Sequence, residues 1–436
     1  MATVDTLACG HAAYAGRSRL CPHLLSPGED DEIDYIRLLT GRGIEADLCC
    51  EPCDLARQQG TPVRLAVACE GCVASYDDAE AGSCTGWRGE PGIVDRPEPV
   101  DPAVVATRLP GFLHTVPAMA PLPTGDQRSV WLLLTDSRWL ISFDADNPSS
   151  RWPGPSQWLA RTRVPRERDN TKVRPRLHTS ADGRFAAVVN DFGRYGEVID
   201  LTAGKVTLKL DNTGNRAEHV PFSLAFTEHA GRTVVVHRTS WNRLDISDAA
   251  TGRLLTAREP AGDPAEFAGL YRGALAVSAG GRWIADDSWA WSPFGVPYLW
   301  DLERWLSRDV WESDTGASRQ WLCQRFDWNT PMRWIGDDLL ALSGIGDEAE
   351  ALAGVRIFDA TSGREVQTFA GPRGALFSSG RRLYAAGPDG LEIWDPFTGA
   401  RTGRIPGFTP SHHHRGTGEL AALTDGHLLR WRISPH

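Results

Sequence analysis

Four cysteines near the start of the chain stand in two pairs, at a spacing that could hold a metal ion. Two residues separate the members of each pair and fifteen residues separate the pairs: Cys50, Cys53, Cys69 and Cys72. Such a pair places both thiolates on one side of a tight turn, and Zn²⁺ takes four thiolate or imidazole ligands in a tetrahedron. The spacing therefore predicts a structural zinc site held by these four cysteines. Cys50 is preferred to its neighbour Cys49 because it completes the two-residue spacing.

A second group of ligand-type residues precedes the first. It consists of two pairs in which one residue separates a cysteine from a histidine: Cys9, His11, Cys21 and His23. Four potential ligands within fifteen positions predict a second zinc ion. Both ions would be structural, because four protein ligands leave no position open for a substrate. Two alternatives stay open: a cross-braced arrangement in which the first and third pairs share an ion, and the use of Cys49 or Cys84 as ligands.

Short elements must position these ligands. Apolar residues recur at helical spacing between acidic residues and Gly41, so we expect a helix at about residues 30–40. A shorter helix is expected at 53–59. Residues 63–68 have the pattern of a strand that leads into the second cysteine pair, with a helical turn after it. This order of strand, cysteine pair and helix is similar to that of treble-clef zinc domains.

Composition and charge exclude several classes of protein. The 436 residues are 41% hydrophobic and 23% charged, as in soluble proteins of more than one domain. No apolar run approaches the roughly 20 residues of a membrane span, and no signal peptide is recognisable. We therefore expect no membrane association and a cytoplasmic location, where cysteines bind metal rather than form disulfides. Residues 1–100 hold 17 acidic and 8 basic residues, so this part should repel nucleic acid.

From about residue 103 the sequence repeats. Several segments end an apolar run with an aromatic or aliphatic residue and an aspartate, followed by a turn that contains glycine. The marker aspartates are Asp144, Asp200, Asp248, Asp301, Asp359 and Asp395. A final copy at 423–432 has Arg432 in place of the aspartate. Successive markers are 36 to 58 residues apart. Repeats of this length predict β-units that pack side by side.

Two of the markers directly follow a tryptophan, at 300–301 and 394–395. Together with the Asp-x-x-Thr/Ser-Gly-Arg/Lys hairpins, they resemble WD-repeat and quinoprotein-like β-propellers over about residues 103–436. The resemblance implies a seven-bladed β-propeller, in which four-stranded blades surround a central channel. The Gly-His dipeptide that begins a typical WD repeat is missing from most copies, so the buried hydrogen-bond tetrad of that family is not expected.

The start of the array resembles a segment near its end. Residues 106–112 are similar to residues 402–408, and the last copy is short. We therefore expect residues 103–110 to supply the outer strand of the last blade, which would remove a free sheet edge. The fold expected is mainly β: a small α+β zinc-binding domain at 1–88, a linker rich in Pro and Gly at 89–102, and a seven-bladed β-propeller at 103–436.

The function expected is that of a monomeric, non-enzymatic scaffold that binds a protein partner. No catalytic motif is present. Two segments could form the binding surface: a basic loop with Arg163 and Arg166, and a hairpin with Trp289 and Trp291. His412, His413 and His414 are expected in an exposed turn, and Cys323 in the core. One alternative is a hydrolase or lyase with its site at the channel mouth, and another is a RING-like ligase adaptor.

Overall fold

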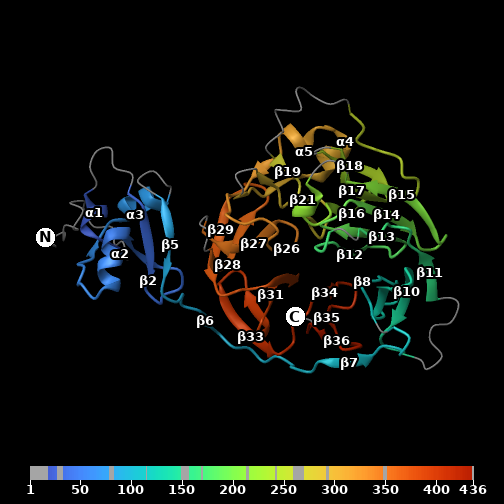
Figure 1. Cartoon of the computed structure of the whole chain (residues 1–436), viewed down its shortest axis with the longest axis horizontal. Coiled ribbons are helices and arrows are strands. Elements are labelled where there is room, and N and C mark those ends of the chain that lie inside the picture. Colours follow the sequence, from blue (N-terminus) through green and yellow to red (C-terminus); the bar gives the residue numbers. More distant parts are fainter. Residues whose placement is uncertain are drawn as a thin grey trace.

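The chain folds into a small N-terminal part and a large array of β-sheets (Figure 1). The computed structural model describes residues 18–26, 33–77, 83–113, 115–148, 157–167, 170–212, 216–240, 243–258, 270–290, 294–346 and 351–434. Cys9, His11 and Trp291 lie outside the described residues. Among the residues that are described, none of the helices has the length and apolar character needed to cross a lipid bilayer.

In its described residues, the N-terminal part contains one five-stranded sheet and three short helices. In spatial order the strands are β4 (Ala66–Val67), β1 (Arg19–Leu20), β3 (Ala46–Cys50), β2 (Tyr35–Leu39) and β5 (Cys84–Arg88). The helices are α1 (Pro22–Leu25), α2 (Glu51–Gln58) and α3 (Glu70–Asp77). The helix expected near residue 53 and the strand expected before the second cysteine pair are both present.

The prediction of a helix at residues 30–40 is wrong, because the described part of this segment contains strand β2 (Tyr35–Leu39). It pairs antiparallel with β3 and parallel with β5, and Tyr35, Ile36 and Leu38 are buried. Aromatic and β-branched residues suit such a central strand. Pairing on both edges therefore outweighs the local helical spacing.

The remainder is mainly β, as predicted, and consists of small antiparallel sheets. The first three sheets contain β8 (Ala118–Pro121), β9 (Val130–Leu134), β10 (Trp139–Asp144) and β11 (Trp158–Arg161); β12 (Arg174–Thr179), β13 (Phe185–Asp191), β14 (Tyr195–Asp200) and β15 (Lys205–Asp211); and β16 (Leu224–His229), β17 (Arg232–Ser240) and β18 (Arg243–Asp248). The next two contain β20 (Leu275–Val277), β21 (Trp283–Asp286), β24 (Tyr298–Asp301) and β25 (Gln320–Trp321); and β26 (Met332–Ile335), β27 (Leu339–Ile345), β28 (Leu352–Asp359) and β29 (Glu365–Ala370). The last two contain β30 (Ala375–Ser379), β31 (Arg382–Gly387), β32 (Gly390–Asp395), β33 (Ala400–Pro406) and β6 (Val94–Asp95); and β34 (His412–His414), β35 (Glu419–Thr424), β36 (His427–Arg432) and β7 (Val105–Arg108).

The described part of the array also contains one small additional sheet and several short helices. A small sheet contains β19 (Leu270–Tyr271), β22 (Trp289–Ala290) and β23 (Phe294–Gly295). The helices are η2 (Ala217–His219), α4 (Leu302–Ser307) and α5 (Glu312–Thr315).

The marker aspartates end the third strand of six sheets, and most of them hold the turn that follows. Asp200, for example, accepts hydrogen bonds from the backbone N–H groups of Thr202 (2.9 Å) and Ala203 (3.0 Å). Asp301 instead accepts from the N–H of Arg304 and so caps helix α4. Short polar side chains favour such turns because they satisfy backbone donors locally.

Clusters of buried apolar side chains lie between consecutive sheets around the array. One cluster packs Leu132 of β9 against Val188 of β13, and similar clusters join each later sheet to the next. A further cluster brings Trp131 together with Leu428 of β36, and so joins the last sheet to the first. The ribbon accordingly forms a ring in Figure 1.

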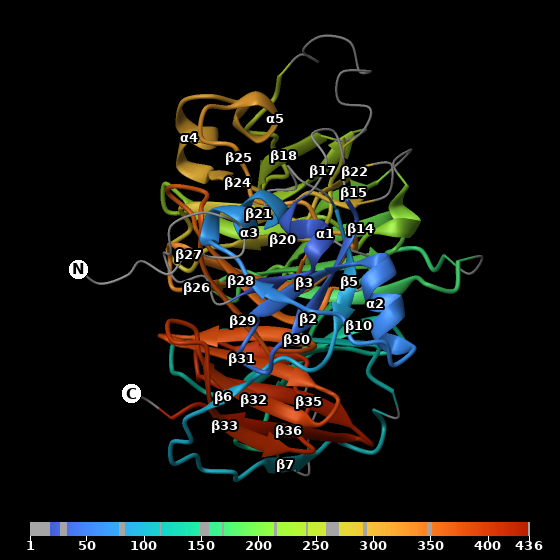
Figure 2. The ribbon, with the colours of Figure 1, turned by 90° about the vertical axis from the view of Figure 1, so that its left-hand side faces the viewer.

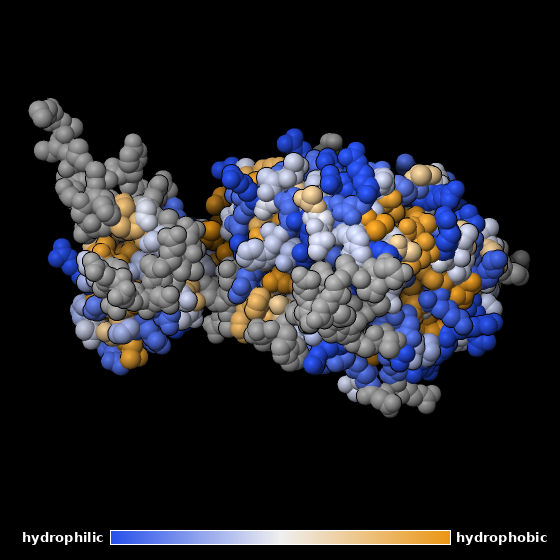
Figure 3. Space-filling model, turned by 90° about the horizontal axis from the view of Figure 1, so that it is seen from above, coloured by the Kyte–Doolittle hydropathy of each residue, from blue (hydrophilic) through white to orange (hydrophobic). Residues whose placement is uncertain are grey.

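Strand β6, just before the array, and strand β7, at its start, pair with strands near its end. Strand β7 pairs antiparallel with β36, with Thr107 opposite Leu428. Strand β6 lies within the expected linker and pairs parallel with β33, with Val94 opposite Ala400. Both pairs can be followed in Figure 2. The small N-terminal part nevertheless stands apart from the array in the space-filling view of Figure 3.

Candidate metal centre

Two similar strand–turn–helix units bring four potential ligands together. Cys21 follows β1 and begins α1, while Cys50 ends β3 and begins α2. A proline stands in the first turn of both helices, where its missing N–H group costs no hydrogen bond. Strands β1 and β3 are parallel neighbours, with Leu20 opposite Leu48. The two turns therefore lie at the same edge of the sheet.

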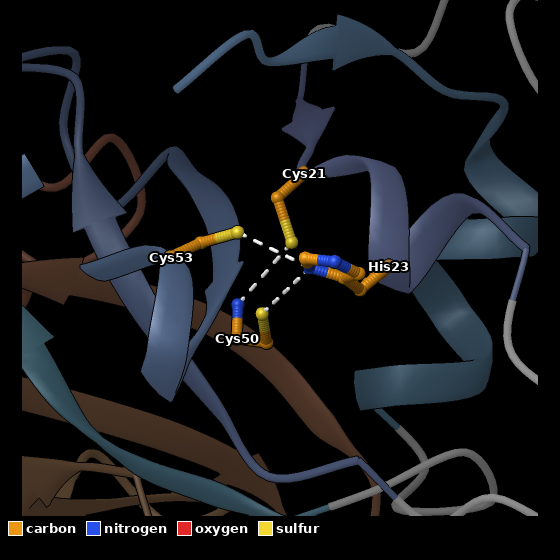
Figure 4. Close-up of side chains that lie close together, drawn as sticks. All are labelled: Cys21, His23, Cys50 and Cys53. Carbon is orange, nitrogen blue, oxygen red and sulfur yellow. Dashed lines mark hydrogen bonds between the residues drawn. The ribbon is translucent and has the colours of Figure 1, made fainter. Parts of the chain in front are cut away.

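The resulting group consists of Cys21, His23, Cys50 and Cys53 (Figure 4). One ligand atom from each residue lies within 4.8 Å of all the others. Nδ1 of His23 lies 3.3 Å from Sγ of Cys50 and 3.2 Å from Sγ of Cys53. The backbone N–H of Cys50 donates to Sγ of Cys21 at 3.3 Å. Among the described residues this is the group of cysteine, histidine or acidic side chains that could hold a metal ion.

The donor set and its spacing fit a tetrahedral ion. With Zn–S bonds of about 2.3 Å and Zn–N bonds of about 2.0–2.1 Å, the ligand atoms of a zinc site lie roughly 3.5–3.8 Å apart. Thiolate and imidazole are also the ligands that structural zinc prefers. A shell of four protein ligands is closed, so the chemistry it supports is stabilisation of a fold rather than catalysis.

The three thiols of the group cannot all ionise easily without a cation. Burial raises the pKa of Cys50 to about 12 and also raises the pKa of Cys53. Burial opposes ionisation of Cys21 as well, but hydrogen bonds from the Cys50 and Leu24 backbone and the neighbouring thiols lower its pKa. Metal binding releases such protons because the cation compensates the negative charges.

Buried polar contacts hold the two turns in place. The carboxylate of Asp47 on β3 accepts from the backbone N–H of Arg19 (2.8 Å) and from its guanidinium, and so fastens β1 to β3. The Tyr76 hydroxyl on α3 donates to the carbonyl of Leu24 at 3.0 Å, and the Tyr35 hydroxyl donates to the carbonyl of Tyr76 at 2.9 Å. These bonds fix α1 and α3 against the sheet and limit movement of the ligands.

The structure groups the predicted ligands differently from our expectation. Cys50 and Cys53 lie with Cys21 and His23, not with Cys69 and Cys72. The reason is the parallel pairing of β1 with β3, which spacing along the chain does not reveal. Cys49 lies next to the group but outside it, and burial raises the pKa of its thiol to about 12.

Cys69 and Cys72 form a third unit of the same kind. Cys69 follows β4 and directly precedes α3, in whose first turn Cys72 lies. The backbone N–H of Cys72 donates to Sγ of Cys69 at 3.4 Å. Cys84 begins β5, and its thiol donates to the carbonyl of Gly86 at 3.5 Å.

The two segments that were expected to bind a partner differ in their exposure to solvent. Arg163 and Arg166 are exposed, and a guanidinium N–H of Arg166 donates to the carbonyl of Asp136 at 2.8 Å. Trp289, in contrast, is 1% exposed and lies between the stacked rings of Tyr271 and Trp328, 4.4 and 4.9 Å away. It cannot serve as a surface anchor, so that expectation is wrong.

Two other expectations concern histidines and a cysteine. His412, His413 and His414 form the inner strand β34 rather than an exposed turn, and His414 is buried. The three consecutive histidines stand between Ser411 and Arg415 without any alternation of apolar and polar residues, so the sequence gives no sign of a strand here. Cys323 is buried in an apolar cluster, as expected.

Comparison with known proteins assigns no family. No protein-family model matches the sequence, and no curated protein is significantly similar to it. Among solved structures, a chain from the crystal structure of the mitotic checkpoint complex aligns with 80% of this chain and 99% of its own length. The sequence identity is 17% and the TM-score is 0.46. A likeness of this extent says nothing about activity or partners.

Proposed function

We propose that this protein is a non-enzymatic scaffold in which a zinc-stabilised module is joined to a seven-bladed β-propeller. The observation that carries the proposal is the closed group of Cys21, His23, Cys50 and Cys53. Four protein ligands stabilise a fold and leave no open coordination position for catalysis. The module would span residues 1–88 and the propeller residues 103–436. A cytoplasmic location, where thiols stay reduced, belongs to the same proposal.

The blade count and the closure rest on the sheets and their contacts. Apart from the small sheet of β19, β22 and β23, seven sheets follow one another in the described part of the array, and apolar clusters join each to the next and the last to the first. The pairing of β7 with β36 supports a blade completed by the start of the array. Such closure removes a free edge that could pair with another chain.

The metal stoichiometry is the finer part of the proposal. One zinc ion would bind to the group of four described above. The ligand-type residues proposed for a second ion are Cys9, His11, Cys69 and Cys72, with Cys49 and Cys84 as alternatives. In this nested arrangement, Cys21 and His23 share an ion with Cys50 and Cys53. A cross-brace would instead place Cys21 and His23 with Cys69 and Cys72. The nested arrangement gives no support to a RING-like adaptor.

The surface that we assign to the protein partner is the exposed loop with Arg163 and Arg166. Exposed arginines at an interface rim steer an acidic partner and act in a salt-dependent way. The partner proposed is therefore an acidic protein surface. The proposal includes a monomeric chain and no binding to nucleic acid.

Two measurements test this proposal on the full-length chain. Elemental analysis of protein purified without added metal should find about two zinc ions per chain, and a value near zero would contradict the zinc assignment. Proteins that co-purify with the chain from its own cells should be lost from the double variant Arg163→Glu/Arg166→Glu. The matched control is Lys205→Glu/Lys209→Glu, which changes two exposed charges on β15 in the same way. Equal loss from both variants would contradict the assigned surface.

A further inference from the structure

The sheets of the array surround a cavity of about 830 Å³. Residues of the first strand of six sheets line it: β8, β12, β16, β20, β26 and β34. Its lining includes two arginines, Arg333 on β26 and Arg415 just after β34, but only one carboxylate, that of the exposed Glu228. The described lining therefore carries an excess of positive charge.

Arg333 has no negative partner among the described residues. Its Nε–H group is buried and makes no hydrogen bond. Burial, together with the charge of Arg415, lowers the pKa of Arg333 to about 9, and no carboxylate offsets this effect. At neutral pH the guanidinium is still charged. The Arg333 side chain is half-buried in the cavity wall. A guanidinium held partly out of water without a counter-ion destabilises a fold, so its presence calls for another explanation.

His413 adds a second unused donor beside this guanidinium. Nη2 of Arg333 lies 3.2 Å from Nδ1 of His413. A guanidinium can only donate hydrogen bonds, so Nδ1 must accept and the neutral ring carries its proton on Nε2. That Nε2–H group is buried and has no partner in the described structure. The hydroxyl of Thr330, which lines the same cavity, is unpartnered as well.

A second arginine–histidine pair, of which His178 lines the cavity, has the counter-ion that the first pair lacks. Nε of Arg176 donates to Nε2 of His178 at 3.0 Å, as in the first pair. Arg176, however, also lies 3.2 Å from a carboxylate oxygen of Asp191. The protein supplies a counter-ion to one pair and none to the other.

We propose that the cavity binds a small ligand through a dianionic phosphate group held by Arg333, Arg415 and His413. Two unbalanced guanidinium charges match the charge of about −2 on a phosphate monoester. Arginine and other N–H donors are the usual ligands of phosphate oxygens. The cavity is larger than a phosphate ion, so an organic part of the ligand has room beside it.

Calorimetric titration of the full-length protein with inorganic phosphate, in a chloride buffer, tests this site. We expect saturable binding of one phosphate per chain and a rise in melting temperature on addition of phosphate. Arg333→Met should weaken binding roughly 10- to 100-fold, as expected for loss of a charged hydrogen bond. Without phosphate, this variant should melt at the same or a higher temperature, because it removes a half-buried charge that has no counter-ion. Arg415→Gln changes an exposed residue and should weaken binding without altering the fold.

Three further arms make the test decisive. Arg253→Gln, at an exposed arginine outside the cavity, should leave phosphate binding unchanged. If the natural ligand is an organic phosphate, glycerol 3-phosphate should bind at least as tightly as inorganic phosphate. If the natural ligand is inorganic phosphate, glycerol 3-phosphate should bind more weakly. Either result supports the site. Succinate binding as tightly as phosphate would overturn the assignment to a phosphate group. Heats that do not saturate, or that persist in both Arg333→Met and Arg415→Gln, would mean an adventitious ion only and would overturn the proposal.

Discussion

Asp95 and Arg401, which are 306 residues apart in the sequence, form a two-pronged ion pair. The guanidinium Nε lies 2.7 Å from one carboxylate oxygen and Nη2 lies 2.9 Å from the other. Arg401 also donates to Glu392 on the neighbouring strand at 2.7 Å. The pair lowers the pKa of Asp95 mainly through these hydrogen bonds. It fastens β6, which lies between the N-terminal part and the array, to the outer edge of β33.

Asp95→Ala should loosen β6 without unfolding the array. Arg401 keeps Glu392 as a partner, and Asp95 is largely exposed, so we expect a loss of only about 0.5–1 kcal/mol. Hydrogen exchange should become faster at the backbone N–H groups of Arg96 and Glu98, which donate to the carbonyls of Arg401 and Thr402. The control is Asp126→Ala, which breaks an exposed pair with Arg128 elsewhere. Unchanged exchange at residues 94–98 would show that the ion pair does not hold β6.

Cys50→Ser and Cys49→Ser should differ, although the two residues are adjacent. Cys50 belongs to the ligand group and Cys49 does not. Metal binding is coupled to folding, so Cys50→Ser, which removes a ligand, should lose about one zinc ion per chain and unfold the N-terminal part. Cys49→Ser should keep the metal. Zinc release measured with a chromogenic chelator distinguishes the two, and equal release from both variants would contradict the grouping.

A chain that begins at residue 100 should fold, while one that begins at residue 115 should aggregate. The first retains β7, whose residues Val105–Arg108 pair with β36. The second exposes the unpaired edge of β36, and an exposed edge strand pairs readily with other molecules. Light scattering and gel filtration measure the difference. If both chains stay equally soluble and monomeric, β7 is not needed to close the array.

Acidification should destabilise the array through the histidines of β34. Burial lowers the pKa of His412 to about 4, and burial with nearby arginine charges lowers that of His413 to about 3. An unfolded histidine binds a proton below about pH 6.5, so between that pH and about pH 4 the unfolded state binds more protons. Stability therefore falls as the pH falls through this window. Each histidine contributes at most about 1.4 kcal/mol per pH unit.

The variant His412→Asn isolates this effect from the titration of carboxylates. Its melting temperature should fall less than that of the wild type between about pH 7 and about pH 5, because it removes one proton-binding site from the unfolded chain. Parallel losses in both proteins would show that His412 does not contribute to the acid sensitivity.

Features set by local chemistry could be predicted from the sequence. Asp200 ends a strand and accepts from the two N–H groups of its own turn, so its role depends on residues next to it. The helix after Cys50 is equally local. The grouping of Cys21 with Cys50 depends instead on the pairing of β1 with β3. The burial of Trp289 likewise depends on Tyr271 and Trp328, and no spacing pattern connects these residues.

The pairing of β7 with β36 has a consequence for synthesis of the chain on the ribosome. Thr107 is made early, but its partner Leu428 follows 321 residues later. At roughly 5–20 residues per second, that delay is about 15–65 s. Throughout this time β7 has no strand to pair with. Apolar side chains of the first sheet, such as Trp131, also lack the side chains of the last sheet against which they pack in the folded protein. Until its final strands emerge, the nascent chain therefore exposes an unpaired strand and unpacked apolar side chains.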